Sequence, residues 1–121
     1  NCEIIDIRTI KPLDINLINK SVKKTGRILI LDTGFEICSL ASEIVSKVIS
    51  SNFKFLKSPP EILAMPDVSE PTSYALTKNF YITENEIVNK SLKVLNLNKK
   101  VQKISINHHH DIPGEWFKGP F

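Results

Sequence analysis

The sequence predicts a single α/β domain in which helices cover both faces of a mainly parallel, mixed β-sheet, giving three layers. Three observations support this fold class. Short apolar runs of strand length alternate with stretches that repeat apolar residues at helical spacing. Hydrophobic residues make up 41% of the chain and charged residues 24%, which is typical of a folded globular protein rather than a disordered one. The length of 121 residues fits one domain.

The first predicted element is a strand over residues 2–7. Ile4, Ile5 and Ile7 would point to both faces of the sheet, as in a strand that is covered on both sides. Pro12 follows shortly afterwards and interrupts the run.

A helix is predicted next, over residues 15–25. Asp14 is a suitable N-cap, and Gly26 is suited to the left-handed position that ends a helix. The apolar stripe of this helix consists of Ile15, Ile18 and Val22.

The run at residues 28–31 predicts a fully apolar second strand, which residues 32–34 would end. No glycine-rich phosphate motif surrounds Gly34, so we expect a turn with positive φ there. A second helix is predicted over residues 40–50, with Leu40, Ile44 and Val48 on its apolar stripe.

The rigid segment 58–60 leads into a third predicted strand at residues 61–65, and residues 66–71 read as an extended acidic loop. One helical turn is predicted within residues 73–78.

Thr83 and Glu86 have the spacing of a capping box, which predicts the start of a last helix. Helical periodicity fades at about residue 98, so we predict a domain over residues 1–97 and a C-terminal tail over residues 98–121. The inward-facing residues of the last helix are predicted to be Ile87, Val88, Leu92 and Leu95.

Three strands make a thin sheet for this fold class. We therefore expect that at least one strand is missing at the N-terminus or is supplied by another chain. The sequence starts at Asn1, without Met and within a strand-like run, so the absence of a targeting segment is uninformative.

Ligands of open α/β sheets bind at the carboxyl ends of the strands. Asp32, Glu36 and Asp67 follow the second and third predicted strands, and could together form an acid–base or metal cluster. Loop caps and solvated carboxylates are the interpretation we favour.

Metal binding and thiol chemistry are weakly indicated. At most two of the consecutive side chains of His108, His109 and His110 could face one ion, so we favour a solvated tail. Cys2 and Cys38 form no CxxC pair, and a buried or helix-flanking role suits Cys38 better than that of a nucleophile.

The net charge of +3 is too small to indicate nucleic-acid binding, and no apolar run approaches the length of a membrane span. The residues alone therefore predict an α/β domain with no self-contained active site.

Three stretches of sequence carry a resemblance to a known family. Residues 3–14 read EIIDIRTIKPLD, and residues 23–35 read KKTGRILILDTGF with ASEI at 41–44. Residues 65–76 read MPDVSEPTSYAL, followed by Phe-Tyr at 80–81. Together they resemble the C-terminal, transketolase C-terminal-like domain of the β subunit of thiamine-diphosphate-dependent 2-oxoacid dehydrogenases of the pyruvate, acetoin and branched-chain type.

The resemblance spans residues 2 to about 96 and implies a mixed five-stranded sheet, with one more strand and helix before Asn1. It also implies that thiamine diphosphate and magnesium are held elsewhere in the holoenzyme, between the α subunit and the N-terminal domain of the β subunit. The chain would then hold no catalytic, cofactor-binding or metal-binding residue, and it is not expected to be active alone.

The implied partners are the α subunit, a second β subunit and the dihydrolipoyl acyltransferase. Such a complex decarboxylates a 2-oxo acid such as pyruvate oxidatively and passes the acyl group to lipoyl groups, in the bacterial cytoplasm, the mitochondrial matrix or a plastid. The expected role of this part is subunit assembly and partner docking.

The tail over residues 111–121 holds three of the nine aromatic residues, including the only Trp, which predicts that it packs on a surface. The residues that we predict to lie in an interface are Phe35, Glu36, Asp67, Trp116, Phe117 and Phe121.

Two alternatives remain at this point. The chain could be a freestanding interaction domain derived from such a subunit, or the equivalent domain of transketolase or deoxyxylulose-phosphate synthase. The sequence upstream of Asn1 would separate these alternatives.

Overall fold

The structure is a computed structural model that describes residues 2–77, 80–99 and 118. Its helices and strands, in chain order, are α1 (Ile15–Thr25), β1 (Leu29–Phe35), α2 (Leu40–Asn52), the 3₁₀ helix η1 (Phe53–Phe55), β2 (Glu61–Met65), α3 (Tyr74–Thr77) and α4 (Glu84–Val94).

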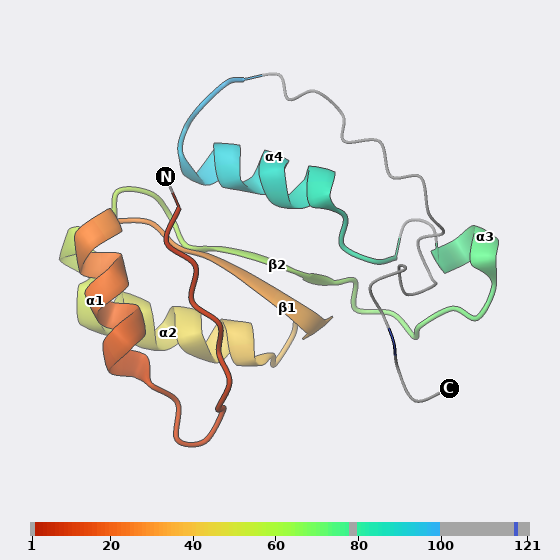
Figure 1. The fold of residues 1–121 in the computed structure, drawn as a ribbon, viewed down its shortest axis with the longest axis horizontal. Coiled ribbons are helices and arrows are strands. Elements are labelled where there is room, and N and C mark those ends of the chain that lie inside the picture. Colours follow the sequence, from red (N-terminus) through yellow and green to blue (C-terminus); the bar gives the residue numbers. More distant parts are fainter. Residues whose placement is uncertain (1, 78–79, 100–117, 119–121) are drawn as a thin grey trace.

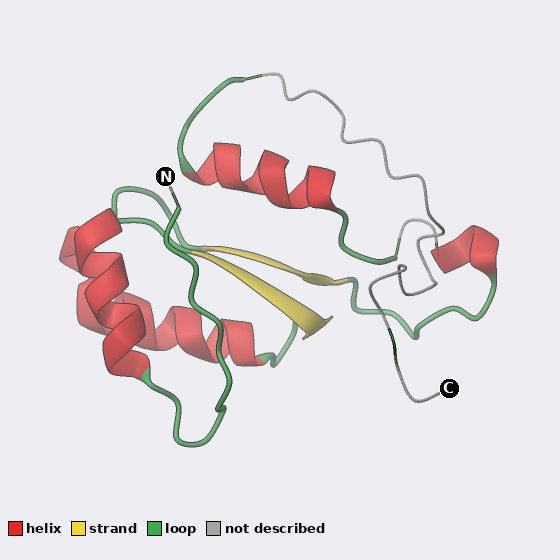
Figure 2. Ribbon diagram, viewed as in Figure 1, coloured by secondary structure: helices red, strands yellow, loops and turns green. Residues whose placement is uncertain are grey.

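A small parallel sheet lies between two helical layers. β1 and β2 pair in parallel, with Leu29 opposite Glu61 and Leu31 opposite Leu63. The helix α2 packs against β1 on one side and against α1 on the other, whereas α4 covers the other face of the sheet (Figure 1). Figure 2 shows the two strands enclosed by these helices. The predicted α/β class with three layers is therefore confirmed.

The core lies mainly between the sheet and the α1–α2 layer. Ile44 and Val48 of α2 are 1% and 0% exposed. Their spacing of four residues puts both side chains on the face that meets the sheet. The remaining buried residues of this cluster are Ile18, Val22, Ile30 and Ala41. The stripes predicted for the first two helices are thus the faces that they bury.

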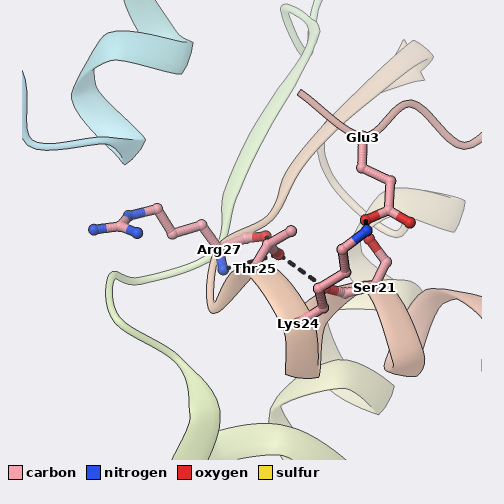
Figure 3. Close-up of polar contacts among 5 residues, drawn as sticks. All are labelled: Glu3, Ser21, Lys24, Thr25 and Arg27. Carbon is pink, nitrogen blue, oxygen red and sulfur yellow. Dashed lines mark hydrogen bonds and ion pairs between the residues drawn. The ribbon is translucent and has the colours of Figure 1, made fainter. Parts of the chain in front are cut away.

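Both ends of α1 carry the predicted capping residues. The Asp14 Oδ1 atom accepts a hydrogen bond from the Leu17 amide at 3.0 Å, and Gly26 has a φ of 74°. The Thr25 hydroxyl donates to the carbonyl of Ser21 at 2.9 Å, inside the last turn (Figure 3). The bond to Asp14 satisfies one of the amide groups that the start of a helix leaves without a partner.

The capping box of α4 is also present as predicted. The Thr83 hydroxyl accepts from the Glu86 amide, and the Glu86 carboxylate accepts from the Thr83 amide at 2.7 Å. The buried face of α4 differs from the prediction at the C-terminal end of the helix. Val94 is 6% exposed there, whereas Leu95 is 42% exposed. The prediction that Leu95 faces inward is wrong, since Leu95 is already the C-cap residue, beyond the last helical turn.

The strand predicted at residues 2–7 is absent from the described residues. This segment is extended but pairs with no strand, and Ile4 is 90% exposed. Ile5 and Ile7 still pack against the core. A 3.3 Å ion pair between Glu3 and Lys24 joins the segment to α1 (Figure 3). The apolar pattern therefore identified core contacts, but a strand also requires a hydrogen-bonding partner.

The strand β1 is longer than predicted, because it continues through residues 32–34 to Phe35. The ladder is irregular between Leu31 and Phe35, where the register shifts. The prediction of a positive φ at Gly34 is wrong: among the described glycines only Gly26 has one. The Gly34 amide donates instead to the Asp32 carboxylate at 2.8 Å.

A compact ion-pair cluster joins β2 to α4. The Glu61 Oε2 atom lies 2.9 Å from the Lys90 ammonium, and the Glu61 Oε1 atom lies 2.7 Å from the Lys93 ammonium. Hydrogen bonds from Lys93 and Lys90 lower the pKa of the Glu61 carboxyl below its usual value. The first residue of β2 is thereby fixed to the last two turns of α4.

This cluster predicts a pH-dependent contribution to stability. Because the pKa of Glu61 is lower in the folded state, its contribution is present above the unfolded value of about 4.3 and is lost as the pH falls through the folded value. Glu61→Gln should therefore unfold at lower urea than wild type at neutral pH, and the difference should shrink below about pH 4. The exposed ion pair of Glu43 with Lys47 supplies the control, and Glu43→Gln should have little effect. A Glu61→Gln difference that is independent of pH would contradict this assignment.

Candidate functional site

The carboxyl ends of β1 and β2 meet at one edge of the sheet. Phe35, the last residue of β1, lies opposite Met65, the last residue of β2. Residues 36–38 follow β1 at this edge, and residues 66–68 follow β2. This carboxyl-end surface is where an α/β sheet presents its functional residues.

The Asp32 carboxylate binds backbone amides at this edge and does not belong to an acidic cluster. Its Oδ1 atom accepts from the Gly34 amide at 2.8 Å, and its Oδ2 atom accepts from the Ala41 amide at 3.2 Å. Ala41 lies in the first turn of α2, so the carboxylate stabilises the positive end of that helix. The loop-cap interpretation therefore holds for Asp32.

Glu36 and Asp67 are exposed at the carboxyl-end surface. The Ser39 hydroxyl donates to the Glu36 backbone carbonyl at 3.0 Å. The Glu36 carboxylate itself makes no hydrogen bond or ion pair within the described residues. The Asp67 carboxylate has no ion pair or hydrogen bond there either. These two acidic side chains are available to a partner.

Large apolar side chains lie exposed beside these carboxylates. Phe35 is 45% exposed, and its neighbour Ile37 is 64% exposed. Val68, which follows Asp67, is 58% exposed. Exposed apolar side chains with polar or charged residues beside them are typical of a protein–protein contact. Ile37 and Val68 are not among the predicted interface residues, and their positions next to Glu36 and Asp67 are the signal that the sequence offers for them.

The loop after β2 is tied back to the segment that precedes α4. The Tyr81 hydroxyl donates a hydrogen bond to the Glu70 carboxylate. The rings of Phe80 and Tyr81 pack edge to face with centroids 5.4 Å apart, and Phe80 is 7% exposed. The acidic loop is thus anchored at its far end, while Asp67 and Val68 stay exposed near β2.

Metal-ligating side chains and glycines are the features that a metal or diphosphate site would need. No group of three His, Cys, Asp or Glu side chains gathers as metal ligands in the part of the chain that is described. Gly26 lies against Lys57 and the Phe55 carbonyl, and Gly34 lies inside β1, so neither of these two glycines forms a phosphate-binding loop. His108, His109 and His110 lie outside the described residues.

Cys38 is exposed, with a φ of 54°, directly before the N-cap Ser39 of α2. It is thus helix-flanking rather than buried. No helix in the described ranges is both long and apolar enough to cross a membrane. Trp116, Phe117 and Phe121 lie outside the described residues, so docking of the tail stays a prediction.

The sequence matches the family described as "Transketolase, C-terminal domain" over residues 1–87. The chain belongs to this family of α/β domains. The resemblance found in the sequence motifs is thereby confirmed.

The most similar relatives include β subunits of two kinds of dehydrogenase. The pyruvate dehydrogenase E1 component subunit beta of Rickettsia bellii is 40% identical over 94 residues, which cover 78% of this chain and 29% of that protein. The mitochondrial subunit of the same name from Chaetomium thermophilum is 36% identical over 93 residues, covering 77% of this chain and 24% of that protein. The acetoin:2,6-dichlorophenolindophenol oxidoreductase subunit beta of Bacillus subtilis is 32% identical over 93 residues, which cover 77% of this chain and 27% of that protein. This chain spans less than a third of the length of each.

Proposed function

We propose that the chain is the C-terminal domain of the β subunit of a thiamine-diphosphate-dependent 2-oxoacid dehydrogenase and that it serves subunit assembly rather than catalysis. The match to the transketolase C-terminal domain family carries this proposal. The relatives among pyruvate and acetoin dehydrogenase β subunits support the 2-oxoacid class. They include bacterial and mitochondrial proteins, so either location is compatible with the proposal.

The carboxyl-end surface is the part of the domain that we assign to subunit contacts. Phe35 with Ile37 and Val68 provides exposed apolar area, and Glu36 and Asp67 provide charge. We assign this surface to the α subunit or a second β subunit, and the tail residues Trp116, Phe117 and Phe121 to the same role. Docking of the dihydrolipoyl acyltransferase is a further proposed role of the domain.

In this proposal the cofactor of the complete enzyme is held by other domains, as the resemblance to 2-oxoacid dehydrogenase β subunits implies. Thiamine diphosphate with magnesium should therefore give no heat of binding when it is titrated into the isolated chain in a calorimeter. The complete enzyme, titrated in the same buffer, is the positive control. Micromolar binding to the isolated chain would contradict the assignment.

A domain exchange tests the proposed function itself. The region of the Rickettsia bellii β subunit that matches this chain is replaced by residues 2–96, and the chimera is produced with the α subunit of that enzyme. The expected result is a chimera that assembles and oxidises pyruvate. A chimera that folds but neither assembles nor turns over pyruvate would overturn the proposal.

A further inference from the structure

The charges of this chain are unevenly distributed along the sequence. Residues 15–31 and 44–60 hold seven of the sixteen Lys and Arg residues and no Asp or Glu. The rest of the chain holds nine Lys and Arg residues against thirteen Asp and Glu. The net charge of +3 therefore conceals two basic stretches within an otherwise acidic chain.

The two basic stretches meet at the amino end of the sheet. The Lys57 amide donates to the Gly26 carbonyl at 2.7 Å, which joins the end of α1 to the segment after η1. The Lys23 ammonium lies 5.7 Å from the centre of the Phe55 ring, within the range of a cation–π contact. We call the exposed residues of this junction the lysine–phenylalanine surface. Its members are Lys20, Lys23, Phe53, Lys54, Phe55 and Lys57.

This surface combines free positive charge with exposed aromatic area. Phe53 is 74% exposed and Phe55 is 49% exposed. Two acidic residues near the start of the sheet and the end of α1 are already paired, since Glu61 binds two lysines of α4 and Glu3 binds Lys24. Its four lysine members carry no ion pair with any described residue. The surface also lies at the opposite end of the strands from the carboxyl-end surface, so it is a separate site.

We propose that the lysine–phenylalanine surface binds an acidic polypeptide segment that carries an apolar or aromatic side chain. The lysines would attract the carboxylates, and the two phenylalanines would supply contact area for the apolar side chain. The proposal goes beyond the assembly role, which we assign to the carboxyl-end surface.

The described features favour a polypeptide over a nucleic acid or a membrane. A nucleic-acid site needs a longer basic stripe than one helix end and one short segment, and the surrounding chain is acidic. A membrane-surface helix presents an apolar face along its length, whereas here Phe53 and Phe55 lie on a three-residue 3₁₀ helix. An acidic segment of another protein matches both the small size and the charge.

The test uses the full 121-residue chain and a fluorescein-labelled synthetic peptide that is rich in Asp and Glu and carries a central Leu-Phe pair. Fluorescence anisotropy should show saturable binding that weakens as salt is added. Lys23→Glu with Lys54→Glu should weaken binding by about tenfold or more, and Phe53→Ser should also weaken it. All three positions are exposed, and circular dichroism verifies that each variant folds.

Matched controls make the result decisive. Lys11→Glu with Lys99→Glu changes the total charge equally at exposed positions outside the surface, and should alter binding by less than about twofold. A peptide in which Ser-Ser replaces Leu-Phe should bind more weakly than the parent. The absence of saturable binding, equal losses in both double variants, or tighter binding of single-stranded DNA or of phosphatidylserine vesicles than of the peptide would each overturn the proposal.

Discussion

Replacing Ile44 with alanine is expected to lower the free energy of unfolding by about 2–5 kcal/mol. The Ile44 side chain is 1% exposed in the centre of the core, where α2 meets α1 and the sheet. Truncation removes buried methyl and methylene groups and leaves a cavity that the neighbouring helices fill only in part. Urea unfolding followed by circular dichroism measures the loss.

A matched control shows whether the loss of stability depends on the burial of the side chain or only on replacing isoleucine with alanine. Ile37 is 64% exposed, so Ile37→Ala should change the stability by less than about 0.5 kcal/mol in the isolated chain. Similar losses at both positions would show that the α2 face does not form the core described above.

Replacing Gly26 with alanine is expected to cost about 2–4 kcal/mol, for two independent reasons. The residue has a φ of 74°, a backbone conformation that is unfavourable for any residue with a Cβ atom. A Cβ atom there would also lie 2.8 Å from the Lys57 side chain and 3.0 Å from the Phe55 carbonyl oxygen. That carbonyl belongs to the backbone and cannot move away without disturbing η1.

Gly34→Ala is the control for this prediction. At Gly34 an added Cβ atom would meet only the Asp32 carboxylate, at 3.2 Å, and the φ angle is not positive. The loss of stability in Gly34→Ala, measured by thermal unfolding, should be clearly smaller than the loss in Gly26→Ala. A Gly26→Ala variant as stable as wild type would mean that the end of α1 is not closed as described.

The elements that could be predicted from the sequence are those with local signals at their ends. Asp14 and Gly26 bound α1, and Thr83 with Glu86 begins α4, because capping depends on residues only a few positions apart. The bounds of β2 were also predicted correctly, since proline precedes the strand and follows it.

The first predicted strand failed because strand formation depends on a distant partner. Residues 2–7 have a strand-like composition, but no described strand pairs with them, and among the described strands β1 pairs with β2 alone. The notion that a further strand completes this sheet stays a prediction. It would supply hydrogen bonds to the free edge of β1, which otherwise could template association.

The place of three candidate residues at the strand ends could be predicted, whereas their role in an interface stays a prediction. Phe35, Glu36 and Asp67 could be named because parallel strands bring their carboxyl ends to one edge. Asp32 was grouped with them, yet its carboxylate caps the backbone of α2. The positions of Ile37 and Val68 beside Glu36 and Asp67 can be read from the sequence, but their exposure cannot, because it depends on which elements fail to cover them.

The most direct test of the assembly role uses the complete β subunit with its α subunit and measures their association by sedimentation velocity. Phe35→Ser with Ile37→Ser should weaken the association by about tenfold or more, as the loss of an interface anchor does. Leu97→Ser, at a side chain that is 43% exposed beyond the end of α4, should leave it unchanged. If the Phe35 and Ile37 variant folds and associates as tightly as wild type, the carboxyl-end surface is not a subunit interface and the assembly role proposed for it is wrong.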